Sequence, residues 1–156
     1  MARNVTGASP VTDLRARALR LLARREHSRA ELQRKLASHV EEGVDLEALL
    51  DDFTKRGWLS EERFVEQAVR AKSRKFGPLK IAHYLREKGI DEPGMARALA
   101  QARAGEAQAL EAAWRTRFGA PPADVAAKAR QIRFLQGRGF SLGSIMDLLR
   151  RFDSAR

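Results

Sequence analysis

The sequence predicts an all-α protein, an elongated array of three degenerate three-helix repeats with about nine short helices. Three observations support this prediction. Apolar residues recur at helical spacing, β-branched residues and hairpin turns are sparse, and one pattern of paired helices occurs three times. A chain of 156 residues is long enough for one modest core or for a short array of small units.

The first predicted helix shows the spacing most clearly. Leu14, Ala18, Leu21 and Leu22 follow the pattern of one buried helix face, and arginines fill the opposite face. Helix boundaries follow from capping residues. Ser28 with Glu31 three positions later forms a capping box, and Gly77-Pro78 and Ser60-Glu61-Glu62 are typical of helix starts. Lys55-Arg56-Gly57 and Glu87-Lys88-Gly89 are typical of helix ends.

The repeat becomes visible when Ser28, Gly77 and Ser141 are aligned as anchors. The residues four and eight positions after each anchor are apolar, and the residue just before it is a histidine or a phenylalanine. These positions are Leu32, Leu36 and His27; Ile81, Leu85 and Phe76; and Ile145, Leu149 and Phe140. The anchors lie 49 and then 64 positions apart, so the repeat is degenerate.

The simplest grouping of the helices gives three repeats after a disordered tail at residues 1–12. The repeats are then expected at 13–58, 59–103 and 104–156, with third helices near 45–56 and 91–103 in the first two. Each repeat is too small to bury its own apolar face and must stack on its neighbours, which predicts an elongated array.

Composition limits the class of protein. There is no cysteine, which excludes disulfides, thiol catalysis and cysteine-ligated zinc. No stretch has the length of apolar sequence that a signal peptide or a membrane span needs, so we expect a cytoplasmic protein that does not bind membranes. Thirty Lys and Arg against twenty Asp and Glu give a net charge of +10, which favours polyanionic partners. No self-complementary apolar stripe is evident, so a monomer is expected.

Four motifs in order resemble the RecX family of bacterial regulatory proteins. They are the segment HSRAELQRKL at 27–36, GWLSEERF at 57–64, the basic stretch that leads to GPLKIAHYL at 77–85, and KGI at 88–90. Glu61 stands where the family more often has Asp, and either acid suits a first helical turn. A weaker resemblance continues through 132–149.

This resemblance implies a protein without catalytic activity that binds the RecA recombinase filament on single-stranded DNA. Such proteins modulate, and usually inhibit, the ATPase, strand-exchange and coprotease functions of RecA in recombination, DNA repair and the SOS response. They are thought to lie along the filament groove and to cap or destabilise the filament. An elongated helical array would suit that groove, and no cofactor is implied.

Two basic stretches are the candidate partner-binding or DNA-binding sites. Each carries a local net charge of +6, one between Arg15 and Lys35 and the other between Ala68 and Lys88. Their bases would meet acidic recombinase residues or DNA phosphates, unless they only solvate amphipathic helices. The candidate residues are Arg29, Arg34 and Lys35 in the first stretch, and Arg70, Lys72, Arg74, Lys75, Lys80, Arg86 and Lys88 in the second.

Catalytic and metal-binding patterns are absent from the sequence. The three histidines have no second ligand at a metal-like spacing, and no phosphate-binding glycine loop is present, so we expect neither an enzyme nor a metal or cofactor site. Most aromatic residues continue apolar faces and should pack in the core. We expect Tyr84 to be the most exposed ring, whereas Trp58 lies in a turn where it could contact the next helix or a partner.

An alternative function is a DNA-binding protein that acts independently of RecA, either sequence-tolerant or of the helix-turn-helix type. The helix that begins with Arg29, Glu31, Gln33 and Arg34 is compatible with a recognition helix. A generic helical scaffold that binds an acidic protein is a third possibility. The three classes differ in an observable way, because an operator reader prefers one duplex sequence strongly, a recombinase regulator is nearly sequence-blind, and a scaffold ignores DNA.

Overall fold

The computed structural model describes residues 7–154, which form nine α-helices and no β-strand. The predicted all-α class and the expected number of helices are therefore confirmed for this part of the chain. The chain divides into two compact units, residues 1–64 and residues 65–156.

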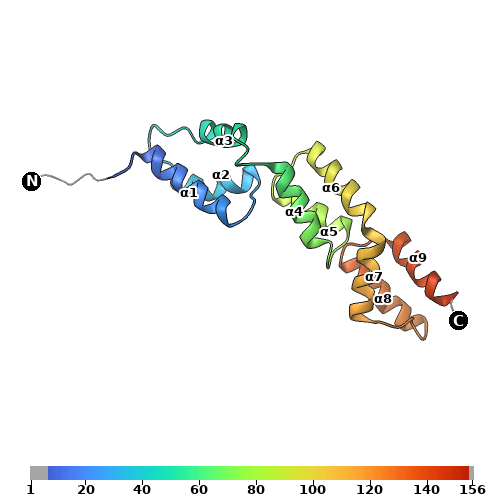
Figure 1. Cartoon of the computed structure of the whole chain (residues 1–156). Helices are drawn as coiled ribbons and strands as arrows, with labels where there is room; N and C mark the ends of the chain where they lie inside the picture. Colours follow the sequence, from blue (N-terminus) through green and yellow to red (C-terminus); the bar gives the residue numbers. More distant parts are fainter. Residues whose placement is uncertain (1–6, 155–156) are drawn as a thin grey trace, which may run out of the picture. The chain divides into compact units, whose positions relative to one another are not determined.

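The first unit contains three helices, α1 (Pro10–Arg24), α2 (Arg29–Ala37) and α3 (Leu46–Lys55). Helix α2 packs against both α1 and α3, as Figure 1 shows. The apolar faces of the three helices together form one core, which is why apolar residues recur at helical spacing in this part of the sequence. The buried members of this core are Leu14, Ala18, Leu32, Leu36, Leu49, Leu50, Phe53 and Leu59.

The helix starts of the first unit follow from side-chain caps. The Ser28 hydroxyl accepts a hydrogen bond from the Glu31 amide at 3.1 Å, and Asp45 caps α3 through the Ala48 amide in the same way. Helix α1 begins at Pro10, inside the segment 1–12 expected to be a disordered tail. Its start is set by the cap at Ser9 and by a proline at the first helical position. Residues 1–6 of that expected tail lie outside the described residues.

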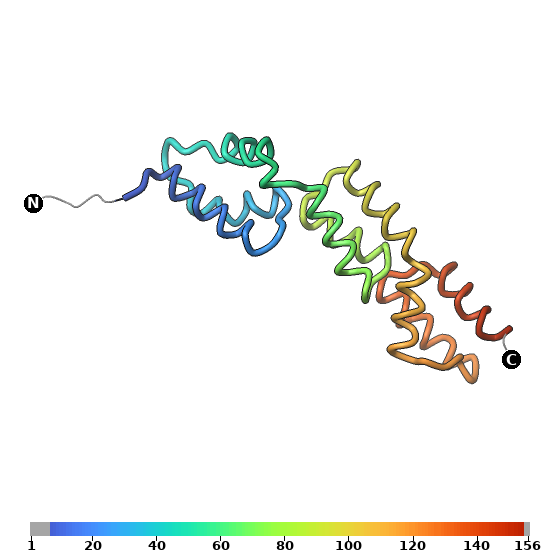
Figure 2. The backbone as a smooth tube through the Cα atoms, in the orientation of Figure 1, coloured from blue at the N-terminus to red at the C-terminus, as the bar shows by residue number. Residues whose placement is uncertain are grey.

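Helix α4 (Glu61–Lys72) begins at the end of the first unit and continues into the second. The others in the second unit are α5 (Pro78–Glu87), α6 (Glu92–Ala104), α7 (Glu106–Arg117), α8 (Val125–Gly137) and α9 (Leu142–Asp153). Helix α5 packs against α6, α6 against α7, and α7, α8 and α9 pack against one another (Figure 2).

The third repeat places its extra helix before the helix pair. In the first two repeats α3 and α6 follow the helices that they pack against, α2 and α5, whereas α7 precedes α8 and α9 and packs against both. The additional helix of the third repeat thus stands at a different place in the chain order. This difference accounts for the longer spacing between the second and third anchors.

The core of the third repeat contains a buried hydrogen bond between two side chains. Trp114 and Gln131 are almost fully buried, and the Trp114 indole N–H donates to Gln131 Oε1 at 2.8 Å. The Gln131 amide in turn donates to the Ala120 carbonyl at 3.1 Å. A buried amide without such partners would lose its hydrogen bonds to water, so this pairing allows both groups into the core. Phe152 stacks on Trp114 with ring centroids 4.5 Å apart.

The second and third repeats meet backbone to backbone at two glycines. The Gly77 amide donates to the Arg138 carbonyl at 2.8 Å, and the Leu79 amide donates to the Gly139 carbonyl at 3.1 Å. The first amides of α5 are thereby satisfied by carbonyls just beyond the end of α8. A Cβ at Gly139 would lie 2.6 Å from the Lys80 backbone nitrogen, and Gly139 has a φ of +90°, so only glycine fits.

We predict that Gly139→Ala destabilises the second unit more than Gly119→Ala, a matched control. Gly119 also has a positive φ, of +70°, but a Cβ there would meet only the Arg115 carbonyl oxygen at 3.3 Å. The backbone strain of about 1–2 kcal/mol is common to both variants. Overpacking against Lys80 should add roughly 1–3 kcal/mol in Gly139→Ala alone.

Urea unfolding followed by tryptophan fluorescence measures both free energies in a Trp58→Phe background, where the buried Trp114 is the one remaining tryptophan. Equal losses in the two variants would mean that the backbone junction at Gly77 and Gly139 yields easily to an added methyl group.

Candidate functional site

Positive charge is concentrated in the second unit. Residues 65–156 contain 18 Lys and Arg against 9 Asp and Glu, a net charge of +9, whereas residues 1–64 contain 12 against 11, a net charge of +1. The overall charge of +10 therefore belongs almost entirely to one of the two units. A polyanionic partner would be attracted to the second unit.

Five arginines of the first unit form ion pairs with carboxylates of the same unit. Arg29 lies 2.8 Å from both Glu47 Oε2 and Asp51 Oδ1, two acids one helical turn apart on α3. Further pairs join Arg15 and Arg56 to Asp52, Arg63 to Glu26, and Arg25 to Glu31. The hydrogen bond from Arg15 is the main reason why the pKa of Asp52 is lowered. Within the basic stretch of the first repeat, Arg15, Arg25 and Arg29 are thus already paired with acids of their own unit.

The other two candidate bases of the first repeat differ in their surroundings, since Lys35 contacts a buried histidine and Arg34 is exposed. His27 is 1% exposed, its Nδ1 lies 3.0 Å from the Arg25 carbonyl oxygen, and its Nε2 lies 3.3 Å from Lys35 Nζ. With Nδ1–H donating to the carbonyl, Nε2 is free to accept from the Lys35 ammonium. Lys35 is therefore engaged with a buried ring, and Arg34 is exposed.

In the second repeat, three of the four candidate lysines lie around two aromatic rings. Lys72 Nζ lies 3.9 Å from the Tyr84 ring centroid and 5.8 Å from that of Phe76. Lys80 stands over Phe76 at 4.8 Å, and Lys88 stands over Tyr84 at 5.5 Å. These distances are typical of cation–π contacts, which hold the ammonium groups near the surface without neutralising them.

Arg74 and Lys75, in the segment after α4, line an open hollow of about 430 Å³ together with residues of the third repeat. Arg117, at the end of α7, and Arg138, the residue after α8, are the other two bases in its lining. The remaining lining residues are Ala113, Thr116 and Phe134. Four basic side chains from three segments therefore converge on a partly apolar hollow.

We refer to these residues of the second unit as the basic–aromatic surface. It comprises Lys72, Arg74, Lys75, Lys80, Lys88, Arg117 and Arg138 with the rings of Phe76, Tyr84 and Phe134. The two remaining candidates, Arg70 on α4 and Arg86 on α5, are exposed. Of the seven candidate residues in the second repeat, five therefore belong to this surface, and the other two are exposed in the same basic unit.

Sequence reasoning missed Arg117 and Arg138, although the repeat contained a signal for one of them. An arginine stands three positions before each anchor, as Arg25, Arg74 and Arg138. The position three residues after each anchor differs and is occupied by Glu31, Lys80 or Ser144. In the first repeat, Glu31 accepts a hydrogen bond from Arg25 at 2.6 Å. The second and third repeats have no acid at this position, so Arg74 and Arg138 keep their charge for other partners.

The expectation that Tyr84 is the most exposed ring was wrong. Tyr84 is half-buried between Lys72 and Lys88, whereas Trp58 is 40% exposed. Trp58 packs edge-on against Phe53, with ring centroids 5.4 Å apart, and Arg56 lies over it at 5.1 Å. The turn at Gly57 thus places Trp58 beside Phe53 of the first core, where the indole stays partly exposed.

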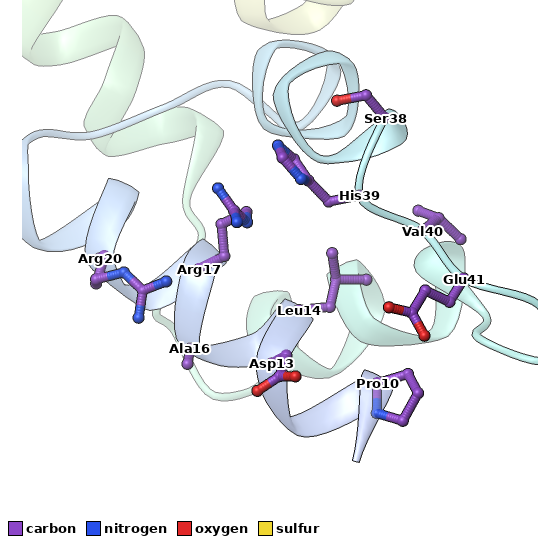
Figure 3. Close-up of a pocket in the computed structure, with 10 residues that line it drawn as sticks. All are labelled: Pro10, Asp13, Leu14, Ala16, Arg17, Arg20, Ser38, His39, Val40 and Glu41. Atoms are coloured by element: carbon purple, nitrogen blue, oxygen red, sulfur yellow. The ribbon is translucent and has the colours of Figure 1, made fainter. Parts of the chain in front are cut away.

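A second hollow, of about 460 Å³, lies in the first unit between α1 and the segment after α2. Figure 3 shows Arg17 and His39 reaching toward each other across it. Its lining also contains Asp13 and Glu41, so acids balance its two arginines, Arg17 and Arg20. This mixed charge makes it a poor site for a polyanion.

Over residues 7–154, no helix has both the length and the apolar character needed to cross a membrane.

Three family models match consecutive parts of the chain. They describe the first, second and third three-helix domains of RecX and match residues 15–44, 60–99 and 104–149. A protein of Leptothrix cholodnii named regulatory protein RecX is 46% identical over 144 residues, which cover 92% of both chains. The chain belongs to the RecX family. A regulatory protein RecX of Neisseria gonorrhoeae is 42% identical over 141 residues, which cover 90% of this chain and 92% of the relative.

Solved RecX structures share the fold. A crystal structure of RecX from Lactobacillus salivarius matches with a TM-score of 0.75 over 94% of this chain and 99% of that one, at 20% identity. A second crystal structure, titled regulatory protein RecX, matches with a TM-score of 0.72 over 91% of this chain. The prediction of three degenerate three-helix repeats is confirmed by these matches and by the three family models.

We predict that His27 makes the first unit less stable in mild acid. Burial is the main cause of its lowered pKa, although the hydrogen bond to the Arg25 carbonyl works in the opposite direction. Below the unfolded-state pKa of 6.5, the unfolded chain takes up a proton that the folded His27 resists. Stability should therefore fall as the pH drops through the interval between 6.5 and the lower folded-state pKa, and level off below it.

The test compares the wild-type chain with His27→Phe, which places in the first repeat the ring that the other two repeats carry before their anchors. Urea midpoints measured between about pH 5 and pH 7.5 should fall less steeply in the variant. His39 and His83 are present in both proteins, so the difference isolates His27. Parallel pH profiles would contradict the prediction.

Proposed function

We propose that this RecX-family protein binds the RecA filament on single-stranded DNA and inhibits or tunes its ATPase, strand-exchange and coprotease activities. The proposal places it among regulators that act in recombination, DNA repair and the SOS response without catalysing a reaction. Curated relatives over 40% identical across most of the chain are named regulatory protein RecX, which supports this assignment.

The observation that carries the proposal is the basic–aromatic surface of the second unit. The DNA strand in a recombinase filament is a polyanion, and its phosphates or acidic side chains of the recombinase would both complement this surface. In the first unit, Arg29 and Lys35 are already engaged, with the carboxylates of Glu47 and Asp51 and with His27 respectively. We therefore propose that the second repeat makes the principal contact and that Arg29, Arg34 and Lys35 contribute less.

We predict that reversing the charge of Arg70, Arg74 and Lys80 to Glu weakens inhibition of the cognate RecA. The three side chains are exposed, so the fold should be retained, while attraction to the filament becomes repulsion. The concentration for half-inhibition of the single-strand-dependent ATPase should rise roughly tenfold or more. The steady-state ATPase rate with the protein titrated in at substoichiometric amounts is the measurement.

A matched control reverses Arg97, Arg103 and Arg130, which are exposed in the same unit but lie outside the basic–aromatic surface. The control should inhibit nearly as well as the wild-type chain. Equal weakening in both variants would mean that only net charge matters. If the variant at Arg70, Arg74 and Lys80 inhibits as well as the wild-type chain, these three residues only form solvated helix surface.

The dose dependence separates the regulator from the alternative, a DNA-binding protein that acts independently of RecA. A regulator that caps or disassembles filaments inhibits well below one molecule per recombinase protomer. A protein that only competes for DNA inhibits when its concentration rivals that of the DNA, and an operator reader prefers one duplex sequence strongly.

A further inference from the structure

The hollow between α7, α8 and the segment after α4 combines a concentrated positive charge with an apolar wall. Arg74, Lys75, Arg117 and Arg138 line it, and Ala113 and Phe134 supply apolar surface. No acidic residue is part of its lining within residues 7–154. Its volume of about 430 Å³ lies in the range of small-molecule sites.

The four bases are not occupied by the protein itself. Among the described residues, none of these side chains forms an ion pair, in contrast to the five paired arginines of the first unit. Four unpaired cations around one hollow repel one another, and an anion placed between them would relieve that repulsion. The hollow therefore favours a ligand with a dense negative charge.

Two of the arginines are held in place before any ligand arrives. The Arg138 guanidinium lies 5.0 Å from the Phe134 ring centroid and 5.5 Å from that of Phe76. Arg117 lies 5.4 Å from the centroids of both Phe118 and Phe134. The Arg138 carbonyl is also fixed by its bond from the Gly77 amide. Side chains ordered in this way lose less entropy on binding than free ones.

We propose that this hollow binds one nucleotide, with its phosphate between the arginines and its base against the guanidinium planes and the apolar wall. The planar fork of arginine matches phosphate oxygens, and bases stack on aromatic rings and on guanidinium planes. An acidic peptide fits less well, because Asp and Glu carry their charge on a short aliphatic stem without an adjoining flat ring.

The nucleotide can belong to a single strand or be free in solution, and both share this chemistry. The inference deepens the proposed function, because it rests on the same basic–aromatic surface and names a ligand for one part of it. Its test contains no recombinase. If the hollow does not bind a nucleotide, the prediction about ATPase inhibition is unaffected. If the protein does not inhibit the ATPase, nucleotide binding by the hollow can still be tested separately.

The experiment uses the full chain and two fluorescent probes that carry the same base. One is an eight-nucleotide single strand with a central 2-aminopurine, and the other is the free 2-aminopurine riboside triphosphate. Stacking changes the fluorescence of the base, so both titrations report contact with the base as well as with the phosphate. Affinities are measured at several salt concentrations.

Two pocket variants remove two charges each, Arg117→Gln with Arg138→Gln, and Arg74→Gln with Lys75→Gln. The second pair keeps the proposal testable if loss of the stacked arginines disturbs the fold, which circular dichroism monitors. Each should weaken binding of the responding probe by roughly tenfold, and for the single strand lower the log–log salt slope by about 0.7, the value for the one phosphate that the hollow holds. The control, Arg97→Gln with Arg103→Gln, removes the same charge from α6 and should change affinity less than about threefold.

Phe134→Leu tests the base contact separately. It keeps all four charges but removes the ring beneath Arg117 and Arg138. The fluorescence change of the bound base should shrink while the salt slope stays the same, because the number of phosphate contacts is unchanged.

The outcomes separate the sources and can overturn the inference. Binding of the strand alone identifies a nucleotide within a polymer, and equal binding of the free triphosphate identifies a free nucleotide. If the pocket pairs and the control pair weaken binding equally, or if neither probe responds, the hollow is not a nucleotide site. A glutamate-rich peptide with one phenylalanine, bound by the wild-type chain and lost only in the pocket variants, would replace the nucleotide with a protein segment.

Discussion

The backbone junction between Gly77 and Gly139 is the constraint on which the basic surface depends. It joins the second and third repeats through hydrogen bonds from the first amides of α5 to carbonyls beyond α8. The positive end of one helix dipole meets the negative end of another, so the contact is favourable in direction as well as geometry. Because Arg138 supplies one of those carbonyls, the junction also fixes where its side chain can reach. Without this close approach, Arg74 and Arg138 would not share one hollow.

Much of the fold could be predicted because its signals are local. The spacing of Leu14, Ala18, Leu21 and Leu22 predicts a helix from a single stretch of sequence, and the cap at Ser28 fixes the start of the next helix. Pro10 shows the limit of this reasoning, since a proline at the first helical position extended α1 into a segment that seemed to lack structure. The boundary was missed because Pro was not counted as a helix start there.

The candidate site was only half predictable because charge depends on neighbours distant in sequence. Arg29 resembles any basic residue at a helix start, yet Glu47 and Asp51 approach it from α3 and satisfy it. Arg117 belongs to a helix that the repeat pattern did not align, and only the packing of α7 on α8 brings it to Phe134. The sequence of a basic stretch therefore shows how many bases it contains, but not which of them the fold has already paired with acids.

The division of charge between the two units has a kinetic consequence. Long-range attraction acts on net charge, so a polyanion draws residues 65–156, with a net charge of +9, far more strongly than residues 1–64, with a net charge of +1. At low ionic strength, the second unit would therefore meet a polyanion before the first unit does. The repeats thus differ in charge although each is built from three helices. The position three residues after the anchor is one example, with glutamate at position 31 and lysine at position 80.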